Sequence, residues 1–147
     1  MFIIDVDGCL TDGGFYYTKN GKAMKRFGPD DADALEPYRD KVVLISADKR
    51  GFRITARRAD DMGLKLYPVP ARNRLLYLRT LGFDMEEHLF MGDGFLDTST
   101  LQACRFGIAP ANAATAARAV ANYVTARSGG DRAVAEAVRV LEREGLL

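Results

Sequence analysis

The chain has 147 residues, of which 48% are hydrophobic and 28% charged, and its formal net charge is +1. This composition predicts one soluble globular domain over residues 1–147, and it excludes a disordered or strongly basic nucleic-acid-binding protein. No apolar stretch approaches the roughly 18 residues that a membrane span needs, and no signal-peptide pattern is expected at the start. Cys9 and Cys104 have no disulfide-type spacing, so we expect a cytoplasmic protein without a membrane or nucleic-acid partner.

The opening residues join an apolar run to two carboxylates. The run predicts a buried strand, and Asp5 and Asp7, two residues apart, point the same way on an extended chain. Gly8 permits the sharp turn that ends the strand. Two acids at the carboxyl end of a central strand repel each other unless a cation lies between them or one is protonated. The stretch therefore predicts metal-assisted chemistry with one carboxylate as nucleophile.

A β-hairpin is expected next, over about residues 14–28. Asn20-Gly21 is a strong two-residue turn signal, and aromatic and alternating residues flank it. Phe15, Tyr16 and Tyr17 form either a flap over a substrate or a surface that packs against another subunit.

The rest of the chain alternates helices with apolar strands. Asp30 is the expected N-cap of a short helix that ends at Tyr38. The later expected strands are 42–47, 64–69, 88–93, 105–109 and 123–124, and the later expected helices are 52–62, 73–81, 97–103, 113–121 and 131–144. This alternation predicts a three-layer α/β/α sandwich around a mostly parallel sheet. We expect its five main strands, numbered along the chain, in the order 5-4-1-2-3.

Polar side chains stand at the ends of three expected strands. Asp5 and Asp7 end the first strand, Ser46 ends the second, and Asp93 ends the fourth, with Asp97 shortly after it. In a doubly wound sheet these ends converge on one crevice. Several carboxylates in one crevice favour a hard cation, and Mg²⁺ is the natural choice because it takes oxygen ligands and keeps waters that a phosphate can displace.

The same crevice carries groups suited to an anion. The hydroxyl of Ser46 can donate a hydrogen bond to a phosphate oxygen. Arg72 or Arg74 can neutralise charge on a transferred group.

Three motifs resemble those of the haloacid dehalogenase superfamily of phosphohydrolases. Asp5-Val-Asp-Gly-Cys-Leu-Thr-Asp12 is similar to the first motif, Ser46 stands where the second-motif Ser or Thr stands, and Gly92-Asp-Gly-Phe-Leu-Asp97 is similar to the fourth. Within the superfamily the chain resembles the capless 3-deoxy-D-manno-octulosonate 8-phosphate and nonulosonate 9-phosphate phosphatases. That narrower resemblance rests on the hairpin, on Lys25-Arg-Phe-x-x-x-Asp31 and on Tyr123-Val-Thr-x-x-x-Gly-Gly-x-Arg132. It implies a fold in which a β-hairpin projects in place of a cap domain.

The resemblance implies Mg²⁺-dependent hydrolysis of a small phosphate monoester, a sugar phosphate above all, through an aspartyl phosphate. Asp5 is the implied nucleophile, and Asp7 the implied general acid and base. The implied metal ligands are Asp5, the backbone carbonyl of Asp7, and Asp93, with Asp97 in support. Capless relatives also imply a homotetramer built through the hairpin. The implied phosphate-binding residues are Ser46, Ala47 and Arg74, and Arg132 is a candidate substrate contact.

Four departures from the family pattern leave the substrate open. Arg74 replaces a lysine, Gly94 replaces a second polar residue after the fourth-motif aspartate, and Ser46 is followed by Ala-Asp rather than Gly-Arg. Asp30 replaces a basic residue and would repel a sugar-acid carboxylate. These departures motivate a second hypothesis, a catalytically weak relative kept as a binding or assembly protein. A third, a phospho-receiver domain, needs a lysine at a later strand end that the sequence does not provide.

Overall fold

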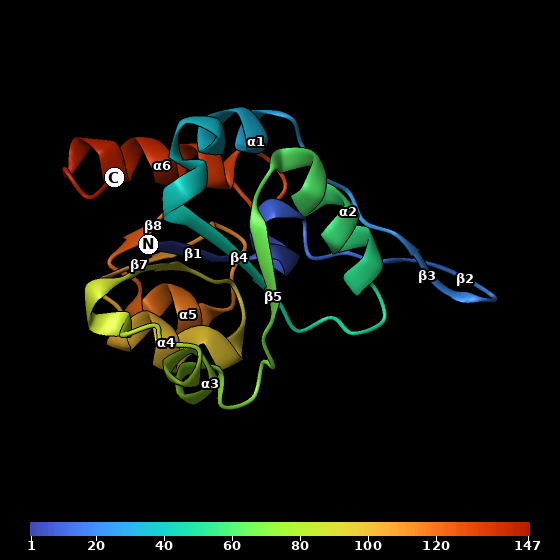
Figure 1. Ribbon diagram of the computed structural model, residues 1–147, viewed down its shortest axis with the longest axis horizontal. Coiled ribbons are helices and arrows are strands. Elements are labelled where there is room, and N and C mark those ends of the chain that lie inside the picture. Colours follow the sequence, from blue (N-terminus) through green and yellow to red (C-terminus); the bar gives the residue numbers. More distant parts are fainter.

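A parallel β-sheet runs through the middle of the computed structural model, which describes residues 1–147 (Figure 1). Its strands lie in the order β5-β4-β1-β6-β7-β8, and every neighbouring pair is parallel. Read from β7 to β5, this is the predicted order 5-4-1-2-3, with β8 added beside β7. The strands are β1 Phe2–Asp5, β4 Val42–Ser46, β5 Lys65–Pro68, β6 Leu89–Met91, β7 Phe106–Ala109 and β8 Tyr123–Val124.

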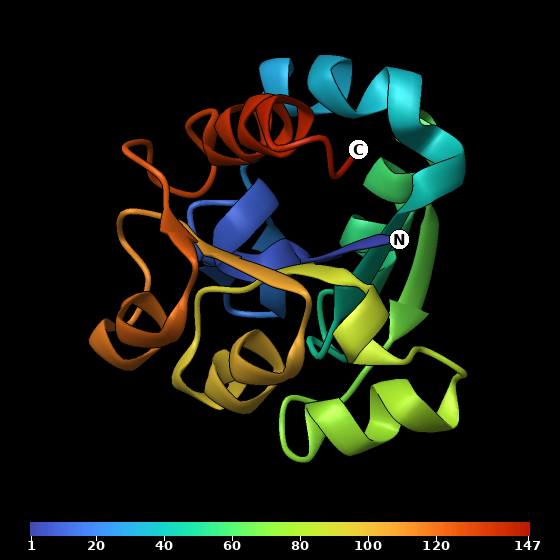
Figure 2. The ribbon, with the colours of Figure 1, turned by 90° about the vertical axis from the view of Figure 1, so that its left-hand side faces the viewer.

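Helices cover both faces of the sheet, which confirms the predicted sandwich. Figures 1 and 2 show α1, α2 and α6 on one face and α3, α4 and α5 on the other. None of these helices has the length and apolar character needed to cross a membrane. The helices are α1 Asp30–Leu35, α2 Phe52–Met62, α3 Arg74–Thr80, α4 Thr98–Ala103, α5 Thr115–Val120 and α6 Ala133–Arg143.

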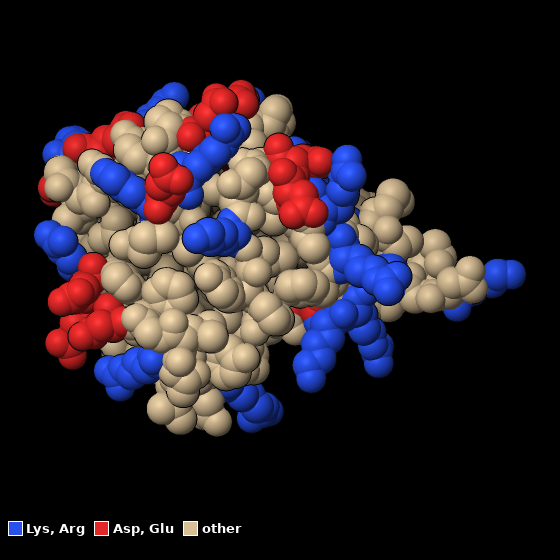
Figure 3. Space-filling view, viewed as in Figure 1, with Lys and Arg blue, Asp and Glu red and all other residues tan.

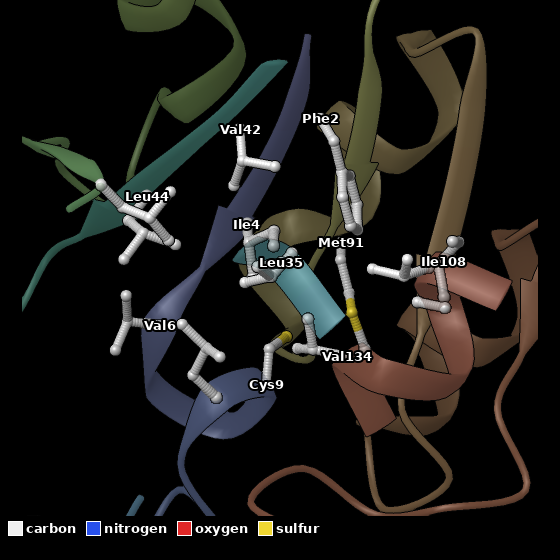
Figure 4. Packing of buried hydrophobic residues seen from close by; sticks show 14 of the residues in the cluster. Phe2, Ile4, Val6, Cys9, Leu35, Val42, Leu44, Met91, Ile108 and Val134 are labelled. Carbon is white, nitrogen blue, oxygen red and sulfur yellow. The ribbon is translucent and has the colours of Figure 1, made fainter. Parts of the chain in front are cut away.

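The first strand supplies both hydrophobic cores. Successive side chains of a strand point to opposite faces, and accordingly Phe2 and Ile4 pack in one buried cluster while Ile3 packs in the other. Figure 4 shows Phe2 and Ile4 among residues of the first cluster, including Leu35 of α1 and Val134 of α6. Because both faces of β1 are buried, the strand is held rigidly. The residues at its carboxyl end are therefore also fixed in position.

The predicted hairpin is present as a separate two-stranded antiparallel sheet. It consists of β2 Tyr16–Thr18 and β3 Gly21–Met24, and Gly21 adopts the positive φ of +109° that the tight turn requires. Figure 1 shows the hairpin projecting from the side of the molecule opposite both termini, beyond the carboxyl end of β1. Lysine and arginine side chains gather where it leaves the body (Figure 3).

The N-cap prediction for Asp30 is wrong. Helix α1 begins at Asp30 itself, Pro29 occupies the N-cap position, and no side chain caps the first turn. The Asp30 carboxylate instead accepts a hydrogen bond from Arg132, which precedes α6. Arg132 is far from Asp30 in the sequence, and a capping rule that considers only neighbouring residues cannot predict such a contact.

Candidate active site

Three carboxylates meet at the carboxyl ends of two adjacent strands. Asp5 is the last residue of β1, Asp93 follows β6, and Asp97 ends the 3₁₀ turn Phe95–Asp97 before α4. One oxygen from each of these side chains lies within 4.8 Å of the others. The predicted convergence of the first and fourth motifs is therefore observed, and Asp97 lies in the same acidic group.

Arg74 is the basic residue that reaches this group. It is the first residue of α3, its side chain is buried, and its Nη1 donates to Asp5 Oδ2 at 2.6 Å and also to Asp97. Arg72, the alternative cation of the motif, makes no such contact. Within the fourth motif, the backbone N–H of Gly94 donates a hydrogen bond to Asp97 Oδ2 at 2.9 Å. Gly94 thus supports the Asp97 carboxylate through its backbone.

The single positive charge of Arg74 does not neutralise the negative charge of three carboxylates. Burial raises the pKa of Asp5 to about 8; Arg74 opposes that rise and Asp97 adds to it. Burial, followed by the charge of Asp97, raises the pKa of Asp93 to about 6. The three candidate ligands all offer carboxylate oxygens, and burial together with neighbouring negative charge raises the pKa values of Asp5 and Asp93. This donor set fits a hard divalent cation such as Mg²⁺.

Asp7 lies beside the acidic group but has different partners. Its Oδ1 accepts a hydrogen bond from Lys25 Nζ at 2.6 Å, and its Oδ2 accepts one from Ser46 Oγ at 2.8 Å. Ser46, at the end of β4, is buried. The structure therefore brings the first-motif and second-motif residues together, as predicted, and it adds a lysine from the end of the hairpin.

Glycines permit the close packing around the acidic loop. Gly8 has a φ of +95°, and a Cβ there would overlap the carboxylate of Asp93. A Cβ on Gly129 would overlap the carbonyl oxygen of Gly8, and the N–H of Gly130 donates to the Cys9 carbonyl at 3.0 Å. The backbone of Gly129 and Gly130 therefore packs directly against the loop that carries Asp7.

A pocket of about 320 Å³ opens beside these groups. It is lined by Asp5, Asp7, Phe15, Lys22, Ala47, Asp48, Ala71 and Arg74. The expected phosphate-site residues Ala47 and Arg74 therefore line the same pocket as both catalytic candidates. Arg132 does not: it lines a separate cavity of about 780 Å³ between α1 and α6, where Asp30 and Asp131 occupy its guanidinium.

Lys22, Lys25 and Asp48 were missed as site residues. Asp48 forms ion pairs with Lys22 at 2.6 Å and with Lys25 at 2.9 Å. Burial raises the pKa of Asp48, but the two ammonium groups outweigh it and bring that pKa to about 2. Lys25 lies in a segment that carries the family resemblance, and Asp48 is itself a departure from the second motif. These two features of the sequence are the signals that could have identified Lys25 and Asp48 as site residues.

Comparison with known proteins agrees with this geometry. Residues 73–138 match the family model described as haloacid dehalogenase-like hydrolase. The chain is 29% identical over 139 residues to a 3-deoxy-D-manno-octulosonate 8-phosphate phosphatase of Haemophilus influenzae, covering 91% of this chain and 77% of that protein.

Solved structures are similar over almost the whole chain. A 3-deoxy-D-manno-octulosonate 8-phosphate phosphatase of Moraxella catarrhalis, in complex with magnesium, phosphate and a KDO molecule, superposes with a TM-score of 0.83 at 26% identity, covering 97% of this chain and 84% of that one. A hypothetical protein of Xanthomonas campestris superposes with a TM-score of 0.83 at 32% identity, covering 99% and 83%. Residues 73–138 thus match the haloacid dehalogenase-like hydrolases, and the chain is a phosphatase that resembles the 3-deoxy-D-manno-octulosonate 8-phosphate phosphatases over nearly its whole length.

Proposed function

We propose that the protein hydrolyses the phosphate monoester of a small sugar or polyol, with Mg²⁺ as cofactor and through an aspartyl phosphate on Asp5. The observation that carries this proposal is the position of Asp5: it is a buried carboxylate at the end of β1, it lies in one group with Asp93 and Asp97, and it accepts a hydrogen bond from Arg74. Phosphoryl transfer needs in-line positioning and charge neutralisation, and these groups can supply both.

The chain's own residues then have distinct roles. The Asp5 carboxylate attacks phosphorus, and the bond to the leaving oxygen breaks as Asp7 gives that oxygen a proton. Asp7 next takes a proton from a water molecule, which attacks the aspartyl phosphate and releases phosphate and free Asp5. The groups that hold the phosphate are the hydroxyl of Ser46, the backbone N–H of Ala47, and Arg74.

The proposed metal ligands are Asp5, the backbone carbonyl of Asp7, and Asp93, and Asp97 supports them. When bound, Mg²⁺ neutralises charge on the phosphoryl oxygens and keeps Asp5 ionised. Arg74, freed from part of its pairing with Asp5 and Asp97, is then available to the phosphate.

The substrate class follows from the relatives and from one contact of this chain. The relatives are named as phosphatases of a phosphorylated sugar acid. Here Asp30 places a negative charge next to Arg132 and pairs with it. Arg132 is paired with Asp30 and lies outside the pocket that Asp5 and Asp7 line, so it is not available there to a sugar-acid carboxylate, and we propose a neutral sugar phosphate rather than a sugar-acid phosphate.

A panel of phosphate esters tests this function. We expect the purified protein to release phosphate from neutral sugar phosphates in the presence of Mg²⁺, and to release it more slowly from 3-deoxy-D-manno-octulosonate 8-phosphate. A preference for the sugar acid would contradict the substrate class. A folded protein with no Mg²⁺-dependent turnover of any ester would support the binding or assembly hypothesis instead.

We also propose that the hairpin contacts a second copy of the chain in a homotetramer. Its side chains Tyr16, Tyr17 and Met24 are 49%, 60% and 58% exposed, although they are large and apolar. Sedimentation of the wild type should give a tetramer, and Tyr17→Asp should shift it toward smaller species. A wild-type monomer at all concentrations would contradict this assembly.

Both cysteines of the chain are free, and we propose the cytoplasm as the compartment of the protein.

A further inference from the structure

Lys25 is a fully buried cation next to the proposed general acid. It directly follows β3, and its side chain has 0% relative exposure. Its ammonium donates to Asp7 Oδ1 at 2.6 Å and to Thr55 Oγ1 at 2.8 Å, and it lies 2.9 Å from Asp48 Oδ2. The ammonium therefore makes two hydrogen bonds, to Asp7 and Thr55, and one ion pair, with Asp48.

The partners of Lys25 are themselves held in place. Asp48 pairs through Oδ1 with Lys22, whose Nζ also lies 3.3 Å from the centroid of the Phe15 ring, and the same Oδ1 accepts from the Gly51 N–H at 3.1 Å. Thr55 is buried on α2. The ammonium is therefore fixed between the hairpin, the loop after β4 and α2, which gives it little freedom to move.

The two oxygens of Asp7 consequently have unequal surroundings. Oδ1 is bound to the ammonium of Lys25, whose side chain is fully buried. Oδ2 is bound to the hydroxyl of Ser46, a group assigned to the phosphate in the proposed function. When a phosphate takes the Ser46 hydroxyl, Oδ2 loses its partner and Oδ1 keeps its own.

We propose that Lys25 is a positioning residue that fixes Oδ1 of Asp7, so that Oδ2 is the oxygen that exchanges a proton with the leaving group. This role rests on the proposed function, because it concerns the same transfer step. Asp7 Oδ2 gives its proton to the leaving oxygen as the phosphorus–oxygen bond breaks, and it regains a proton from the hydrolytic water. Proton transfer depends strongly on the geometry of donor and acceptor.

The test is the dependence of kcat on the leaving group in Lys25→Met. An acidic phenol such as 4-nitrophenol leaves with little help, whereas phenol, with a pKa of about 10 like that of tyrosine, needs a proton. We expect Lys25→Met to lose about ten-fold more kcat with phenyl phosphate than with 4-nitrophenyl phosphate. Lys19→Met is the matched control, because Lys19 is an exposed lysine of the same hairpin, in the turn between β2 and β3. It should leave the ratio of the two rates at the wild-type value.

Thr55→Val covers the case in which Lys25→Met does not fold. It keeps every charge and removes one acceptor of the ammonium, and it should change the ratio of the two rates in the same direction by a smaller factor. Equal losses with both esters in the variants that fold, or an identical change in Lys19→Met, would overturn the positioning role alone. Absence of turnover in the wild type would instead overturn the proposed function, and this role with it.

Discussion

Asp5→Asn is expected to lose Mg²⁺-dependent phosphatase activity by about 10⁴-fold or more, because the amide cannot form the aspartyl phosphate. The side chain has nearly the same shape and can still accept a hydrogen bond from Arg74, so the fold should persist. Phosphate release from a substrate of the wild type measures the loss. Asp40→Asn, at an exposed position, is the control and should retain full activity.

The same variant should be more stable than the wild type at high pH. The pKa of Asp5 is raised in the folded protein from 3.8 to about 8, so the metal-free native state binds this proton more tightly than the unfolded chain does. Stability is therefore lost as the pH rises through that interval. Asparagine does not ionise and escapes the loss. Thermal unfolding without Mg²⁺ should show an advantage for Asp5→Asn that grows between about pH 5 and about pH 8. Full activity in Asp5→Asn would refute the nucleophile assignment.

Mg²⁺ is expected to stabilise the wild type more at about pH 8 than at about pH 5. In the metal-free protein the pKa values of Asp5 and Asp93 are about 8 and about 6, so at the lower pH the cation must displace protons from both. An excess of 100-fold over the dissociation constant stabilises a protein by about 2.7 kcal/mol. For a domain of this size that corresponds to a rise in Tm of about 5–10 °C.

Asp93→Asn separates this effect from general salt stabilisation. The variant loses a proposed ligand and a source of repulsion, so its metal-free Tm should rise while its response to Mg²⁺ falls. Chelation of the metal should abolish phosphatase activity of the wild type. An equal Mg²⁺ shift at both pH values, or an undiminished shift in Asp93→Asn, would contradict the metal site.

The elements of the sheet were predictable because their signals are local. The apolar run before Asp5 and the alternation of helices and strands determine a parallel sheet, and the carboxyl ends of such strands necessarily face one edge. The convergence of Asp5, Asp7, Ser46 and Asp93 followed from that rule and from the motif resemblance. The hairpin was visible in Asn20-Gly21 for the same local reason.

The contacts that could not be predicted join residues far apart along the chain. Lys25 meets Asp48 and Thr55 only after the hairpin base has folded against α2. Asp30 binds Arg132 across the α1–α6 contact, which turned an expected helix cap into an ion pair. Pattern rules describe which residue types occur at a spacing, and they say nothing about which of several charged groups become neighbours in space.

Transfer of the phosphoryl group to Asp5 is tested most directly by trapping the covalent intermediate. The wild-type protein, turning over a substrate with Mg²⁺, would be quenched in acid, reduced with borohydride and digested for peptide mass mapping. Borohydride converts an aspartyl phosphate to homoserine, so we expect homoserine at position 5, dependent on both Mg²⁺ and substrate. Homoserine at another aspartate, or none in a sample that is releasing phosphate, would contradict it.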